Sequence, residues 1–199
     1  MISRRNIRVK VMQTLYALHA DSPGKQEAVT GKGANMLNEK LDRTLDTFTV
    51  CILYLTRIAQ YAEIDARNRA GKYLPTDADL HVSTKIAGNE FLWKILENET
   101  FKAAIKERKL ERYLEDSWIR KIYQQLAQTS EYQSYTGIPV REPAPEKAII
   151  QFIWEQQMRT NEGLMEYFSD ELPGWEDDRD MIHMLMENFF RLPNRINFL

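Results

Sequence analysis

The residues best suited to bind an anion lie near the start of the chain. Four basic side chains fall within seven positions, and no acidic side chain occurs in the first twenty residues: the four are Arg4, Arg5, Arg8 and Lys10. Ser3 fits the N-cap position of a helix, so the arginines would occupy its first turn and a half. A helix N-terminus carries about half a positive charge, and each cation there costs about 0.3–1 kcal/mol. This arrangement favours a bound anion; a solvated basic terminus without a ligand is the alternative that the segment alone leaves open.

The element that must position these arginines is a helix. Ile7, Val11, Leu15 and Leu18 recur at helical spacing, which predicts a first helix with this stripe in the core. The residues from His19 onward end the predicted helix. The polar stretch up to Ala34 contains three glycines, which predicts a loop.

A second, much longer helix is predicted from Asn35 to Gly71. This range contains no proline, and its only glycine is the last residue. Its apolar residues recur at alternating steps of three and four, close to a heptad: they are Leu37, Leu41, Leu45, Phe48, Ile52, Leu55, Ala59, Ala62 and Ala66. A helix of about 36 residues spans roughly 54 Å. We expect it to be the spine of the domain, and we attribute the cations at its end to the helix dipole.

The rest of the chain also predicts helices and no strands, so the expected class is an all-α bundle. The predicted ranges are 83–98, 100–109, 116–129, 145–158, 161–170 and 177–190. We expect a single domain over 1–199. A cluster of glycine and prolines makes 135–145 the place where a sub-boundary would fall.

An internal repeat is suggested by two similar triplets, Phe91-Leu92-Trp93 and Phe152-Ile153-Trp154. Each is followed by a short apolar helix, an aromatic residue with acidic neighbours, and a further apolar helix. This order predicts a three-helix unit used twice, with shared apolar faces.

Catalytic and metal-binding patterns are missing from the sequence. The three histidines are scattered, Cys51 is the only cysteine, and no HExxH, CxxC, GxGxxG or P-loop motif occurs. We expect neither an enzyme nor a bound metal or cofactor. The acids from Asp177 to Asp180 lack the spacing of a calcium loop and suit a helix N-terminus. Cys51 lies in an apolar run, which predicts a small core residue.

The expected location is the cytoplasm. The basic start is not followed by the apolar segment of a signal peptide, and the longest apolar run is too short to span a bilayer. The net charge is −2, but residues 141–190 hold twelve acids against four bases. We therefore expect any anion binding to be local to the basic start.

The segment from Arg4 to Ala17 resembles the N-terminal signature of NusB, the bacterial transcription antitermination factor: two basic residues, a third arginine, and a helix reading Gln-x-Leu-Tyr. Leu74-Pro75-Thr76 with Asp79-Leu80, and the long helix before it, are similar to the longer NusB proteins of Bacteroidetes-type bacteria. The resemblance implies an all-α protein that binds boxA-type RNA together with ribosomal protein NusE. Carried over by position, Arg4, Arg5 and Arg8 would contact RNA, with Lys10 as a weaker neighbour.

The resemblance has one departure. Residues 191–199 do not carry the family's C-terminal Asn-Glu signature, so we expect either a fragment or a naturally shortened protein, in which NusE binding would be affected. Arginines at a helix N-terminus would hold phosphates without reading base sequence. Tyr16 is the nearest aromatic that could stack on a base, although its helical pattern favours the core. A helical protein-interaction scaffold without RNA binding is the alternative function.

Overall fold

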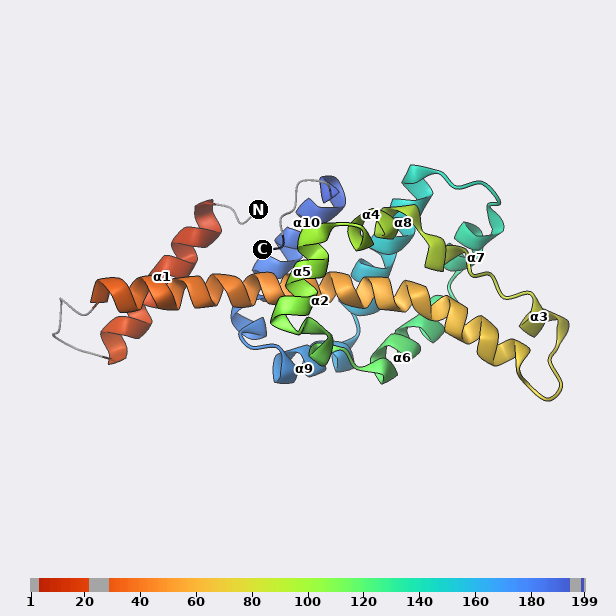
Figure 1. Ribbon diagram of the computed structural model, residues 1–199, viewed down its shortest axis with the longest axis horizontal. Helices are drawn as coiled ribbons and strands as arrows, with labels where there is room; N and C mark the ends of the chain where they lie inside the picture. Colours follow the sequence, from red (N-terminus) through yellow and green to blue (C-terminus); the bar gives the residue numbers. More distant parts are fainter. Residues whose placement is uncertain (1–3, 22–28, 194–197, 199) are drawn as a thin grey trace.

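The computed structural model describes residues 4–21, 29–193 and 198, and all its regular elements are helical (Figure 1). No strand occurs within these ranges, so the all-α prediction is confirmed. The α-helices are α1 (Arg4–Asp21), α2 (Val29–Ala70), α3 (Asp77–Leu80), α4 (Glu90–Leu96), α5 (Glu99–Arg108), α6 (Asp116–Leu126), α7 (Ser130–Gly137), α8 (Pro143–Phe152), α9 (Glu162–Glu171) and α10 (Trp175–Arg191). Two 3-10 turns, η1 (Lys85–Gly88) and η2 (Leu110–Tyr113), and a π-helical turn, η3 (Ile153–Met158), complete the order.

Helix α2 is the spine of the molecule, as predicted. It has 42 residues and runs through the length of the structure, with the shorter helices gathered along it (Figure 1). Every residue from Thr47 to Thr56 is buried, because most of this stretch is apolar and other helices surround it. The hydroxyls of its three threonines donate to carbonyls of the same helix. Cys51 is completely buried here, as the sequence predicts, and burial raises the pKa of its thiol.

The predicted loop up to Ala34 is wrong in its last part, because α2 already begins at Val29. Glycine weakens a helix by about 1 kcal/mol relative to alanine, but Gly33 lets α1 approach closely. A Cβ atom at Gly33 would lie 3.0 Å from Cδ1 of Leu18. Ser3, the predicted N-cap, and residues 22–28 of the predicted loop lie outside the described residues.

The buried face of α1 also differs from the prediction. Of the predicted apolar stripe only Leu18 is buried, while Ile7 and Leu15 are exposed. Lys10 and Thr14 are buried in their place. The reason is that α1 packs on the first turns of α2, away from the main core. The cost of burying the Lys10 charge is offset by an ion pair with Asp178 of α10.

Several helix limits after α2 differ from the predictions. The expected helix over 83–98 is divided by Asn89, whose side chain accepts a hydrogen bond from the backbone N–H of Leu92 and caps α4. Helix α7 extends to Gly137, into the segment 135–145 where glycine and prolines predicted a break. Buried residues on both sides of 138–142 belong to one hydrophobic cluster.

The two halves of the predicted repeat each contain three helical segments in the expected order, α4–α5–α6 and α8/η3–α9–α10. Their anchor residues lie in different surroundings, because Trp93 is exposed and Trp154 is buried. The use of one three-helix unit twice, with shared apolar faces, stays a prediction.

Candidate nucleic-acid interface

The predicted phosphate contacts lie on α1, at one end of the molecule (Figure 1). Arg4 and Arg8 are one helical turn apart and both are exposed. The backbone of Arg5 belongs to the same helix, but its side chain lies outside the described part of the chain. No acidic residue occupies the first turn of α1, so these cations have no carboxylate neighbour within that turn.

Lys10 does not share the exposed surface of Arg4 and Arg8. It is 3% exposed, and its Nζ forms an ion pair with Oδ1 of Asp178, which is 2% exposed. Oγ1 of Thr44 donates a hydrogen bond to the other carboxylate oxygen at 2.5 Å. This cluster connects α1, α2 and α10, so the Lys10 ammonium group is directed into the protein and away from any ligand on the surface.

Tyr16 is exposed, in contrast to the core position that the pattern favoured. Its side chain is 80% exposed, and Met12 on the preceding turn is 67% exposed. Arg8, Met12 and Tyr16 follow one another at steps of four, so they belong to one stripe of the helix. An aromatic ring and basic residues therefore occur on the same helix without being covered by the rest of the protein.

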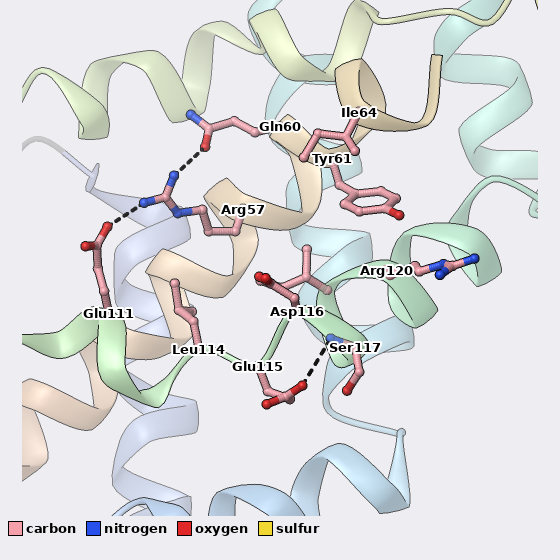
Figure 2. A pocket seen from close by; sticks show the side chains of 11 residues that line it. Arg57, Gln60, Tyr61, Ile64, Glu111, Leu114, Glu115, Asp116, Ser117 and Arg120 are labelled. Atoms are coloured by element: carbon pink, nitrogen blue, oxygen red, sulfur yellow. Dashed lines mark hydrogen bonds and ion pairs between the residues drawn. The ribbon is translucent and has the colours of Figure 1, made fainter. Parts of the chain in front are cut away.

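A hollow of about 790 Å³ lies between α2 and the segment from η2 to α6 (Figure 2). Its polar groups largely bind one another. Arg57 donates to Glu111 at 2.5 Å and to Gln60 at 3.4 Å, and the Glu115 carboxylate accepts from the backbone N–H of Ser117. The cation at its centre, Arg57, is already paired with Glu111, whereas Arg4 and Arg8 of α1 are exposed, so we consider the hollow a weaker candidate site than α1.

A buried polar network surrounds Glu146. Its carboxylate accepts hydrogen bonds from Tyr135 at 2.8 Å, from Arg141 at 3.1 Å and from the backbone N–H of Glu90 at 2.8 Å. Burial and the Glu146 contact raise the pKa of the Tyr135 hydroxyl. Because both carboxylate oxygens already have donors, we interpret the network as a structural connection between α4, α7 and α8.

The described residues offer neither a metal-binding cluster nor a membrane-spanning helix. No group of three or more His, Cys, Asp or Glu side chains there is placed to hold a metal ion. None of the helices described combines the length and apolar character that crossing a bilayer requires.

Comparisons of the chain with protein-family models, curated proteins and solved structures find no match. The resemblance of the N-terminal segment to NusB therefore rests on the residues of that segment alone.

Proposed function

We propose that this protein is a NusB-like transcription antitermination factor that binds boxA-type RNA through α1 and acts in the cytoplasm. The observation that carries the proposal is the exposure of Arg4, Arg8 and Tyr16 on one helix whose sequence resembles the NusB signature. The part played by the arginines is to hold phosphates, which fixes the position of the RNA and leaves base sequence unread.

The structure changes which residues the proposal includes. Lys10 is removed from the contact set because its ammonium group is paired with Asp178 inside the protein. Tyr16 is added because an exposed aromatic ring offers a surface on which an unpaired base can stack. Base stacking on one aromatic residue contributes about 1–3 kcal/mol in single-strand binders. Single-stranded RNA is therefore the expected ligand, in preference to duplex RNA.

Ribosomal protein NusE is the protein partner that the same resemblance implies, and it forms part of the proposal. The expected complex contains both NusE and RNA. Its formation can be followed by size-exclusion chromatography of the three components mixed in pairs and together.

The proposal is tested by a salt titration of RNA binding. We compare the parent protein with Arg4→Ala/Arg5→Ala/Arg8→Ala, using a fluorescent single-stranded boxA-type oligonucleotide. Loss of three phosphate contacts should weaken binding and flatten the slope of log K against log salt by about 2. A matched control removes three exposed cations from other helices, Arg67, Lys94 and Lys106, and should leave the slope unchanged. Equal affinity and slope for the parent and the α1 variant would refute the proposal. Absence of RNA binding by the parent at low salt would refute it as well and would favour a helical scaffold that does not bind RNA.

A further inference from the structure

Helix α1 and residues 29–46 of α2 form an arm that leaves apolar side chains uncovered. Figure 1 shows α1 lying across the first turns of α2 at one end of the molecule. Val9, Met12 and Leu15 are all exposed on this arm. Two crossed helices have too little surface to cover their apolar residues on every side, and a gathered set of exposed apolar residues is typical of an interaction surface.

An apolar cleft runs between the two helices of the arm. Its volume is about 220 Å³, and its lining comprises Val11, Thr14, Leu15, Leu18, Gly33, Ala34 and Leu37. The one hydroxyl among these residues, on Thr14, already donates to the carbonyl of Lys10 at 2.7 Å. The cleft therefore offers contact to apolar side chains and no free polar group to a polar ligand.

The charge around the cleft is positive. Residues 4–21 and 29–46 together hold seven Lys and Arg against four Asp and Glu, although the whole chain has a net charge of −2. One of the seven, Lys10, is paired with buried Asp178. Two of those acids, Asp42 and Asp46, lie near Arg108 of α5, with N···O distances of 3.8 and 2.7 Å. Arg4, Arg8, Val11 and Leu15 follow one another at steps of four, three and four, so a basic stripe leads into the cleft.

These features decide between three possible occupants. A second copy of the arm would bring two sets of arginines together, and the repulsion disfavours it. RNA bases stack on aromatic or guanidinium planes and gain little from an aliphatic cleft. An amphipathic helix has apolar residues at the spacing that fits a groove, and acidic residues on it would meet Arg4 and Arg8.

We propose that the α1–α2 cleft binds an acidic amphipathic helix of a protein partner. The apolar side chains of that helix enter between Leu15 and Leu37, and its carboxylates lie beside Arg4 and Arg8. The two proposals share Arg4 and Arg8. The docking inference also requires the apolar cleft, whereas the RNA proposal also requires the exposed ring of Tyr16, so variants of the cleft separate them.

The test uses a fluorescent 18-residue helical peptide with leucine at positions i, i+3, i+7, i+10 and i+14 and glutamate at the exposed positions. Two control peptides carry lysine in place of glutamate, or the same residues in scrambled order. We expect the acidic peptide to bind and both controls to bind at least tenfold more weakly. Absence of binding by the acidic peptide, or equal binding by the lysine peptide, would overturn the inference.

Protein variants locate the binding site. Leu15→Asp places a carboxylate at a side chain that is 50% exposed, and Ala34→Glu does so at an exposed position of the cleft on α2. Both should weaken binding of the acidic peptide at least tenfold while retaining the helical circular dichroism of the parent. Ile64→Asp, on an exposed apolar residue of α2 outside the arm, is the matched control and should bind normally. Normal binding by both cleft variants would overturn the inference.

RNA binding by a cleft variant separates this inference from the proposed function. The uncharged variant Leu15→Ser should weaken binding of the acidic peptide and still bind RNA within about twofold of the parent, because it adds no charge and Leu15 is not among the proposed RNA contacts. If the peptide fails to bind while RNA binding is intact, the docking inference alone is refuted. If the peptide binds and RNA does not, the proposed function alone is refuted.

Discussion

Replacing Lys10 with methionine should release α1 from the rest of the protein. Lys10 and Asp178 are both buried, and among the described residues the only other side-chain donor to the Asp178 carboxylate is the hydroxyl of Thr44. Removing one partner of a buried ion pair costs about 3–5 kcal/mol, because the remaining charge stays out of water without compensation. Lys10→Met keeps the length and apolar part of the side chain and removes only the charge.

The effect should be local to α1, so amide hydrogen exchange measured peptide by peptide is the appropriate assay. Among the α1 side chains that the structure describes, Leu18 is the one buried residue besides Lys10 and Thr14. The centre of α2, in contrast, belongs to the main core. A loss of 3–5 kcal/mol corresponds to about 150- to 5,000-fold faster exchange when local opening controls the rate. Peptides covering α1 should show this increase, and peptides covering 48–62 should show little change.

A second variant tests the cause. In Lys10→Met/Asp178→Leu neither charge of this pair remains, and the Thr44 hydroxyl can direct its one proton to the carbonyl of Lys40, 2.9 Å away. Replacement of a buried ion pair by apolar residues is often neutral or stabilising, so the double variant should recover most of the lost protection. Lys94→Met, on an exposed lysine, should behave like the parent. Exchange of α1 in Lys10→Met that is within fivefold of the parent would refute the reasoning, as would a double variant no better than the single one.

Three further predictions concern other parts of the structure. Hydrogen bonds from Lys72 and, to a smaller extent, from Thr76 lower the pKa of Asp79 to about 2. The contribution of Asp79 to stability is therefore present above pH about 4 and is lost as the pH falls through 2. In Lys72→Met, a carboxyl NMR titration should show the Asp79 pKa closer to 3.8. Burial lowers the pKa of His183 below 6.5. The unfolded state therefore binds this proton more readily, and stability falls as the pH decreases from 7 to 5. Over this range the thermal midpoint of His183→Gln should fall less than that of the parent protein. Phe168 is fully buried against Tyr54 and Trp175, so Phe168→Ala should lower the free energy of unfolding in urea by about 3–5 kcal/mol.

Each of these three has an outcome that would contradict it. An Asp79 pKa that stays near 2 in Lys72→Met would show that the lysine is not its main cause. Parallel pH profiles for the parent and His183→Gln would remove the histidine as the titrating group. Exposed Tyr73 is the control for the core prediction, since Tyr73→Ala should cost less than about 0.5 kcal/mol; equal losses for the two variants would contradict the assigned core.

The long helix and most of the core could be predicted from the sequence because they depend on local spacing. Apolar residues at steps of three and four mark the buried stripe of α2, and neighbouring residues alone establish that pattern. The same rule placed Ile7, Leu15 and Tyr16 of α1 in a core. It failed there because α1 packs on a projecting part of α2, where few side chains are available to cover it.

The interpretation of Lys10 could not have been made from the sequence. Its partner Asp178 is 168 positions away and belongs to an acidic group that fits a helix N-terminus without further explanation. Only the packing of α10 beside the α1–α2 crossing brings the two charges together. The early start of α2 was missed for a similar reason, because Gly33 is favourable only where another helix approaches it closely.

The central claim is that RNA lies against the exposed face of α1, and photo-crosslinking tests it most directly. A single-stranded boxA-type oligonucleotide carrying 4-thiouridine is bound to the full chain, irradiated and mapped by mass spectrometry. The account predicts crosslinked peptides from residues 4–21, with attachment at Tyr16 or Met12, and loss of these crosslinks in Arg4→Ala/Arg5→Ala/Arg8→Ala. Crosslinks that map instead to the hollow around Arg57 and Arg120, or that persist in the triple variant, would contradict it.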